Sequence, residues 1–153
     1  MTSGLTQFTI NEVTPAYWHV SFSNPPINLQ DPDTILELQE LVGMFETDDA
    51  LRVVVLESSD PNFFINHYDV SRAAETPVAP GPTGLPTFID TTMRLATTSV
   101  VTIAKIRGRN RGGGSEAALA FDLRLPAERK PCSDNQKSAR ACFPAAAHSS
   151  DFP

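Results

Sequence analysis

The residues best suited to chemistry lie in one stretch, where a run of glycines leads into Glu116. The apolar segment Val100–Ile106 predicts a buried strand, glycines 112–114 predict a turn, and Ser115–Phe121 predicts a short helix. A helix N-terminus carries unpaired N–H groups and a partial positive charge, and glycine lets a ligand oxygen come close to the backbone. Such a turn could stabilise an oxyanion while Glu116 transfers a proton beside it. An isolated glutamate in a first helical turn, however, often does no more than interact favourably with the helix dipole.

Alternating strand and helix patterns must position these residues. Short apolar runs at 8–13, 17–22 and 52–56 predict strands, and the last run is continuous enough to be covered on both faces. Asp31 and Pro32 predict the start of a helix, with the aspartate as its cap. The buried face of this helix is predicted by the i, i+3, i+4, i+7 spacing of Leu38, Leu41, Val42 and Phe45.

A second helix is expected after a proline- and glycine-rich segment at 76–86, which predicts a loop. The residues that suggest this helix are Phe88, Ile89, Thr92, Met93 and Ala96. Strands that alternate with helices favour an α/β fold for residues 1–128. Residues 129–153 lack a sustained apolar pattern and predict a disordered tail.

The composition narrows the class of protein. The chain has 153 residues, enough for one domain core, and its formal net charge of −6 argues against a nucleic-acid or anionic-membrane surface. No apolar run could span a bilayer and the N-terminus lacks a signal-peptide pattern, so we expect a cytoplasmic protein. Cys132 and Cys142 suggest no disulfide framework. Because His67 has no second ligand at metal spacing, we expect no metal site.

Taken together, several segments resemble the enoyl-CoA hydratase/isomerase family of the crotonase superfamily. They occur in the family's order and at about its spacing, and the resemblance covers residues 5–128. The segments are Pro26–Asn28, Leu51–Ser58, Phe63–Val70, the strand Val100–Ile106 with Gly112–Glu116, and Phe121–Arg124. The resemblance implies a crotonase-like α/β fold, a β-β-α spiral of the ClpP/crotonase kind, of which this truncated chain carries the N-terminal part.

The resemblance also implies roles for particular residues. Family members hold the thioester carbonyl of an acyl-CoA between two backbone N–H groups, which here belong to Tyr68 and Gly113. Glu116 matches the first of two glutamates that act as general acid and base on water. The residues implied to contact substrate are Tyr68, Asp69, Val70, Ser71, Gly112 and Gly113. Coenzyme A enters as part of the substrate, with no separate cofactor, and family members form homotrimers or hexamers.

The sequence departs from the family pattern at three places. His67 stands where the family has glycine, and Tyr68 stands where it has a small residue. Because backbone N–H groups carry the function, the change at Tyr68 need not abolish it. No residue matches the second glutamate. Asp69 is also explained as a cap of the turn that follows it, rather than as a base.

The tail has an explanation in the reading frame. Back-translation of residues 129–153 with free wobble bases, read in a shifted frame, allows the string K-A-V-L-G-Q-P-E-V-G-A-G-L-F-P-G-G-G-A-L-Q-R-F-P. This string resembles the missing family segment, with the second glutamate encoded across the codons of Gln136 and Lys137. We therefore hypothesise a frameshift near Glu128–Lys130, which the coding DNA would test. A chain truncated in this way is predicted to be unstable and weakly active or inactive.

Three functions remain open at this point. The first is hydration of a 2-enoyl-CoA, with Tyr68 and Gly113 as the oxyanion hole and Glu116 as the general acid/base. The second is an enoyl-CoA isomerase or another crotonase reaction, which shares the oxyanion hole and differs in its acid/base set. The third is a non-catalytic fragment that at most binds coenzyme A or associates with intact homologues.

Overall fold

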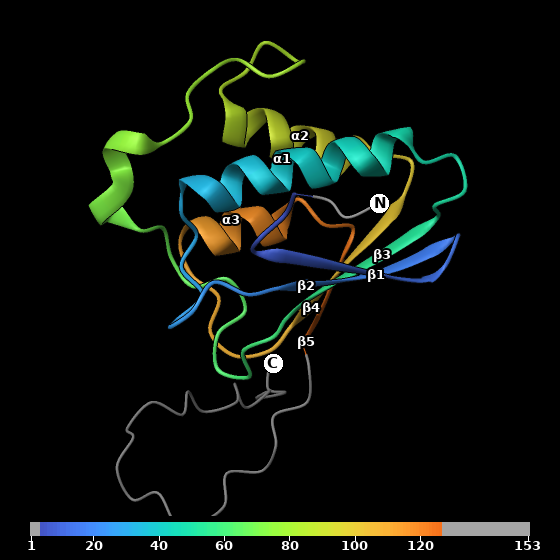
Figure 1. The fold of residues 1–153 in the computed structure, drawn as a ribbon, viewed down its shortest axis with the longest axis horizontal. Helices are drawn as coiled ribbons and strands as arrows, with labels where there is room; N and C mark the ends of the chain where they lie inside the picture. The colour runs from blue at the N-terminus through green and yellow to red at the C-terminus, as the bar shows by residue number, and fades with distance from the viewer. Residues whose placement is uncertain (1–3, 127–153) are drawn as a thin grey trace, which may run out of the picture.

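A five-stranded sheet forms the centre of the computed structural model, which describes residues 4–126 (Figure 1). Its strands are β1 (Phe8–Thr14), β2 (Tyr17–Phe22), β3 (Val53–Ser58), β4 (Val101–Ile106) and β5 (Leu123–Pro126). They lie side by side in chain order. β1 and β2 pair antiparallel, and every later pair is parallel. The predicted tail at 129–153 lies outside the described residues.

Helices connect the parallel strands and cover one face of the sheet (Figure 1). α1 (Pro32–Thr47) follows β2, and α2 (Thr87–Thr97) follows β3 after a short 3₁₀ helix, η1 (Val70–Glu75). α3 (Gly113–Leu119) follows β4. Because the crossovers between parallel strands are right-handed as a rule and run in one direction along the sheet, successive helices fall on the same side. The prediction of an α/β fold is confirmed.

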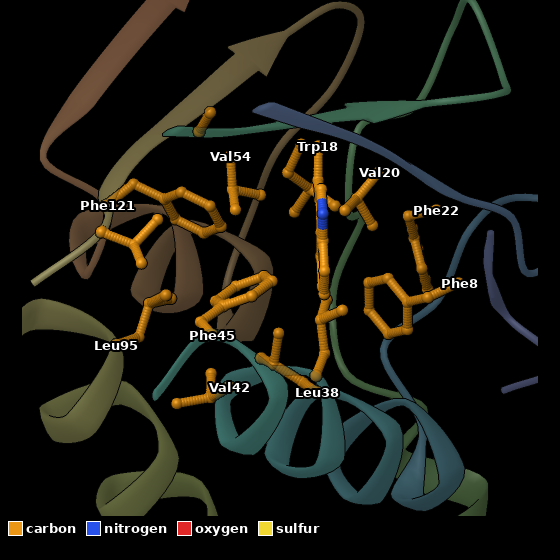
Figure 2. Packing of buried hydrophobic residues seen from close by; sticks show 14 of the residues in the cluster. Phe8, Trp18, Val20, Phe22, Leu38, Val42, Phe45, Val54, Leu95 and Phe121 are labelled. Atoms are coloured by element: carbon orange, nitrogen blue, oxygen red, sulfur yellow. The ribbon is translucent and has the colours of Figure 1, made fainter. Parts of the chain in front are cut away.

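The hydrophobic core fills the space between the sheet and these helices (Figure 2). Alternate residues of β2 and β3 are buried there, as the period of two in a strand requires. Trp18 meets Phe45 of α1 edge to face, with ring centroids 6.2 Å apart, and Phe8 lies 5.1 Å from Phe22 at a tilt. Each such pair contributes about 0.5–1.5 kcal/mol beyond the area that it buries. These contacts join the first two strands to α1.

The predicted start and buried face of α1 are confirmed. Asp31 caps the helix, because its Oδ1 accepts a hydrogen bond from the Thr34 N–H at 2.8 Å while its own N–H donates to Thr34 Oγ1 at 3.1 Å. Burial tends to raise the pKa of Asp31, but its hydrogen bonds, led by the one from the Thr34 backbone, hold that pKa below its ordinary value. The predicted core positions are all buried: Leu38, Leu41, Val42 and Phe45.

The predicted second helix is confirmed as α2, although two of the apolar residues that suggest it lie on its exposed side. Ile89 and Met93 are 49% and 51% exposed. The buried residues of α2 are Thr87, Asp90, Thr91 and Leu95. The Asp90 carboxylate accepts hydrogen bonds from the N–H and the hydroxyl of Thr83 at 2.8 and 2.7 Å, and Arg94 lies 3.3 Å away. Because its charge is paired in this way, Asp90 can be buried against the rest of the fold.

β3 is covered on one face only, so its predicted burial on both faces is wrong. Its residues alternate between buried and half-buried. The half-buried face carries polar groups: Glu57 lies 3.3 Å from His19 Nε2 and 2.7 Å from Lys105 Nζ. Since all three α-helices lie on the opposite face, no described helix covers this side of the sheet (Figure 1).

Candidate functional site

The candidate site lies beyond the carboxyl ends of the parallel strands β2, β3 and β4. The connections that leave these ends run through residues 23–31, 59–69 and 107–112, which we call the loop cluster. Ligands of open α/β sheets commonly bind at this edge, because the loops that follow neighbouring strands converge there. The loop cluster contains Tyr68 and leads directly into Gly113.

Backbone hydrogen bonds hold the loop cluster together. The Asn66 N–H donates to the carbonyl oxygen of Asn28 at 2.8 Å, and the Arg111 N–H donates to that of Asn66 at 3.2 Å. The Phe64 N–H donates to the Arg109 carbonyl at 2.8 Å. The loop after β3 therefore lies between the other two loops and is bonded to both.

The backbone around Tyr68 leaves its own N–H without a backbone acceptor. Gln30 forms a parallel bridge with Tyr68. In this bridge the Gln30 N–H donates to the His67 carbonyl at 3.1 Å, and the Asp69 N–H donates to the Gln30 carbonyl at 2.8 Å. Both hydrogen bonds of the bridge are formed by the residues on either side of Tyr68, so the Tyr68 N–H points away from Gln30. In the described part of the chain, no backbone carbonyl accepts a hydrogen bond from this N–H. The Tyr68 hydroxyl shares a 2.7 Å hydrogen bond with Thr76 Oγ1.

The glycine run provides a second free N–H at the first turn of α3. Gly112 has a φ of 50°, a left-handed conformation that favours glycine. The Gly114 N–H donates to the Arg111 carbonyl at 3.1 Å, and the Glu116 N–H donates to the Gly112 carbonyl at 3.0 Å. The Gly113 N–H has no backbone acceptor among the described residues. As the first residue of the helix, Gly113 carries one of the N–H groups that a helix leaves unpaired.

The start of α3 differs from the prediction. The helix begins at Gly113 and ends at Leu119, so it is displaced toward the N-terminus of the expected range. Glycine is a poor helix former, which is why the sequence pattern assigned this residue to a turn. Packing requires glycine at Gly114, where a Cβ would overlap the backbone carbonyl oxygen of Ile65, whereas a Cβ on Gly113 would meet Gln30 Oε1, the end of a side chain. The helix start therefore packs closely against the other two loops.

A cavity of about 380 Å³ joins the three residues that the sequence predicts as the centre of the site. Tyr68, Gly113 and Glu116 all line it. Its wall is completed by Gln30, Ile35, Thr76 and Phe88. Glu116 lies one helical turn after Gly113, so the two residues share one face of α3. The residues that carry two free N–H groups and a carboxylate therefore line one space.

Sequence reasoning missed four of the lining residues. Gln30 comes two positions after the segment Pro26–Asn28, and this nearness was the only available signal. Ile35 and Phe88 belong to the apolar patterns of α1 and α2, where core packing is the ordinary explanation. Thr76 has no signal in the sequence, because the loop that carries it is placed by tertiary contacts.

The other residues predicted to contact substrate lie outside this cavity. Asp69 caps η1, accepting hydrogen bonds from the N–H and the hydroxyl of Ser71 at 3.0 and 2.6 Å. Val70 is 79% exposed on the same short helix. Gly112 lies next to the side chain of His67. The capping interpretation of Asp69 fits these contacts, and a substrate contact by Asp69, Val70, Ser71 or Gly112 stays a prediction.

A larger cavity, about 890 Å³, lies in another part of the fold. It lies between β1 and the C-terminal end of α1, and Phe8, Trp18 and Met44 contribute to its wall. It contains none of the free N–H groups of the loop cluster, so we place the site at the smaller cavity.

Within residues 4–126, no three His, Cys, Asp or Glu side chains gather as metal ligands would. No helix in that range has the length and apolar character needed to cross a bilayer.

Comparison with known proteins identifies the family. The family model for enoyl-CoA hydratase/isomerase matches residues 14–138. The chain belongs to the enoyl-CoA hydratase/isomerase family. The resemblance inferred from the sequence is thereby confirmed. No curated protein matches the chain in sequence.

Solved structures share the crotonase-like fold of this family member. A protein provisionally described as an enoyl-CoA hydratase, from Streptomyces avermitilis, is 27% identical with a TM-score of 0.68, and the match covers 78% of this chain and 45% of that one. DspI from Pseudomonas aeruginosa is 27% identical with a TM-score of 0.64, over 78% and 49% of the two chains. An enoyl-CoA hydratase from Bacillus anthracis, 22% identical with a TM-score of 0.66 over 78% and 46%, shows the fold alone. The family member studied here therefore spans about half the length of these structures.

Proposed function

We propose that this chain binds acyl-CoA thioesters in the cavity of about 380 Å³ and hydrates a 2-enoyl-CoA. One observation carries the proposal: Tyr68 and Gly113, whose N–H groups have no backbone acceptor among the described residues, line the same cavity as Glu116. Paired N–H donors stabilise an oxyanion, and a carboxylate beside them can move a proton. Membership of the enoyl-CoA hydratase/isomerase family supports this assignment.

Each group then has a defined part in the reaction. The two N–H groups hold the thioester oxygen, and this polarisation makes C3 of the enoyl chain electrophilic. Glu116 accepts a proton from water as the water oxygen bonds to C3, and the C2=C3 electron pair moves toward the thioester oxygen as an enolate. Glu116 then returns the proton to C2, which yields the 3-hydroxyacyl thioester. Each oxyanion donor of this kind contributes about 10²–10³ in rate.

The lining and the volume of the cavity favour a substrate with a short acyl chain. Ile35 and Phe88 provide an apolar surface, while the Tyr68 ring is held by its hydroxyl on Thr76. Its volume of about 380 Å³ is near the lower end of ligand pockets, which span roughly 300–1,000 Å³. We therefore propose a substrate of few carbons beyond the thioester, with coenzyme A as its carrier.

A second candidate function is isomerisation of a 3-enoyl-CoA to a 2-enoyl-CoA. Glu116 is the only carboxylate that lines the cavity within the described residues, and a hydratase of the family uses two. A single carboxylate can remove a proton from C2 while the enolate forms, and then deliver it to C4. The third function, binding without turnover, shares the same cavity. A cytoplasmic location stays a prediction.

Replacement of Glu116 by glutamine tests the proposal in the 153-residue chain. With crotonyl-CoA as substrate, Glu116→Gln should lower kcat by about 10²–10⁴, the range of general acid–base catalysis, while the neutral side chain still fits the cavity. Product analysis by mass spectrometry separates added water from a moved double bond. Butyryl-CoA binding, measured by calorimetry, should persist in the variant.

The matched control is Glu40→Gln, which removes one exposed carboxylate from α1, away from the cavity. Its turnover should equal that of the wild-type chain. Unchanged turnover in Glu116→Gln contradicts the assigned role. Double-bond migration without hydration selects the isomerase, and binding of butyryl-CoA without any turnover in the wild-type chain selects the third function.

A further inference from the structure

Gln30 lines the cavity, and its side chain carries a buried oxygen without a hydrogen-bond partner among the described residues. The residue is buried, with 2% of its surface exposed, and its Oε1 has no hydrogen-bond partner in the described part of the chain. A buried oxygen without a donor is destabilising, and folded proteins satisfy nearly all such groups. A ligand that donates a hydrogen bond to Oε1, once the carboxamide turns this oxygen toward the cavity, would remove the penalty.

The backbone holds Gln30 beside both proposed oxyanion donors. It is bridged to Tyr68, and its side chain lies so close to Gly113 that a Cβ there would overlap Oε1. Glu116 lines the same cavity one helical turn beyond Gly113. A thioester oxygen held by Tyr68 and Gly113 would therefore place C2 and C3 of the acyl chain close to Gln30.

The chemistry of the acyl chain limits what Gln30 could bind. An unsatisfied acceptor requires a donor, and neither the thioester oxygen, the sulfur nor a hydrocarbon chain supplies one. A hydroxyl group on C3 does, and so does the water molecule that becomes this hydroxyl. The terminal torsion of a carboxamide is soft, so Oε1 can turn to accept from the hydroxyl, or Nε2 can donate to its oxygen.

We propose that the carboxamide of Gln30 binds the oxygen substituent at C3 of the acyl chain and makes the site selective for 3-hydroxyacyl thioesters over unsubstituted ones. This inference rests on the proposed binding of acyl-CoA and is independent of turnover. During hydration the same hydrogen bond orients the attacking water, whose proton goes to Glu116.

Calorimetric titration of the 153-residue chain with butyryl-CoA and with each enantiomer of 3-hydroxybutyryl-CoA tests the inference. One hydroxylated enantiomer should bind about three- to tenfold more tightly than butyryl-CoA, which is the effect of one hydrogen bond between neutral groups. Gln30→Met keeps the length of the side chain and removes both polar atoms. It should bring this ratio to about one and leave butyryl-CoA affinity within about twofold, because only the hydrogen bond is lost.

Phe88→Leu is the matched control, because Phe88 lines the same cavity without a hydrogen-bonding group. It should change both affinities alike. Gln30→Leu is a second variant, and circular dichroism reports the folding of each one. Even if both variants unfold, the wild-type chain decides the question through its preference between the two ligands.

The possible failures are distinguishable. Equal affinity of the wild-type chain for the two ligands, or a parallel loss of both in Gln30→Met, overturns the selectivity role and leaves the acyl-CoA proposal standing. No binding of butyryl-CoA by the wild-type chain overturns the acyl-CoA proposal itself, and the inference with it.

Discussion

Between α1 and the sheet, side chains provide the contacts, whereas in the loop cluster the backbone provides them. Trp18, Phe45 and Leu41 are buried in one continuous apolar core (Figure 2). The loop cluster instead depends on bonds such as that from the Asn66 N–H to the Asn28 carbonyl, 2.8 Å long. Side-chain packing excludes water and leaves no polar group free. Hydrogen bonding between the backbones of irregular loops pairs some N–H and C=O groups and leaves others without a partner.

The unused groups are those proposed to bind the ligand. The N–H groups of Tyr68 and Gly113 and the Oε1 of Gln30 have no partners in the described part of the chain, and all three residues line one cavity. The contacts that stabilise the fold and the groups proposed to bind the ligand thus lie in different parts of the molecule. Substitutions in the α1 core should change the free energy of unfolding, and substitutions in the loop cluster should change binding more than stability.

The largest effect on stability is expected in the α1 core. Phe45 is 2% exposed, and truncation to alanine removes its contact with Trp18 and leaves a cavity. Phe45→Ala should lower the free energy of unfolding by about 3–5 kcal/mol, measured by urea denaturation. Leu36→Ala on the same helix is the control, since Leu36 is 48% exposed, and it should change stability by less than about 1 kcal/mol. Equal losses in the two variants would contradict the comparison.

An intermediate loss of stability is expected from substitution of one of two adjacent glycines of α3, and a smaller loss from substitution of the other. A methyl group at Gly114 meets the backbone carbonyl of Ile65, so Gly114→Ala should destabilise the fold by about 1–3 kcal/mol. A methyl group at Gly113 meets only the end of the Gln30 side chain, which can move. Gly113→Ala should therefore cost less than about 1 kcal/mol, yet weaken butyryl-CoA binding about tenfold by displacing Gln30 into the cavity.

Thermal unfolding and calorimetry on the same samples measure both quantities. If Gly113→Ala lost stability as Gly114→Ala does, the helix start would be part of the rigid core rather than of the binding site. If Gly113→Ala bound butyryl-CoA normally, the end of the Gln30 side chain would not be displaced into the space that the acyl chain occupies.

The smallest effect is expected at Asp31, where the two regions meet. Its pKa lies below the ordinary value of the unfolded chain, so the carboxylate stabilises the native state above about pH 4, and this contribution is lost as the pH falls through the folded pKa. Asp31→Asn keeps a capping side chain but does not titrate. At pH 7 it should change stability by less than about 1 kcal/mol, and its stability should fall less than that of the wild type between about pH 5 and 2. Urea denaturation across this range checks the result, and parallel pH curves would refute it.

Prediction from sequence succeeded where a pattern is local. The cap at Asp31 and the apolar spacing of α1 are confirmed, because a helix start and a helical face depend on residues within a few positions of one another. The burial of Asp90 in α2 had no signal in the sequence, because it depends on contacts with Thr83 and Arg94 that pair its charge. The start of α3 was displaced because close packing against the Ile65 carbonyl, rather than helix propensity, selects glycine at Gly114.

The features of the candidate site likewise fall into those that local sequence patterns predict and those that depend on contacts between distant segments. The sequence by itself determined the family, the types of the reactive groups and the place of Glu116 in the first turn of a short helix after glycines. The tertiary structure decided which N–H groups stay unpaired, and it brought Gln30 against Gly113. The physical reason is that spacing along a helix or strand sets which neighbouring residues share a face. Contacts between separate loops depend instead on how the strands that carry them pair in the sheet.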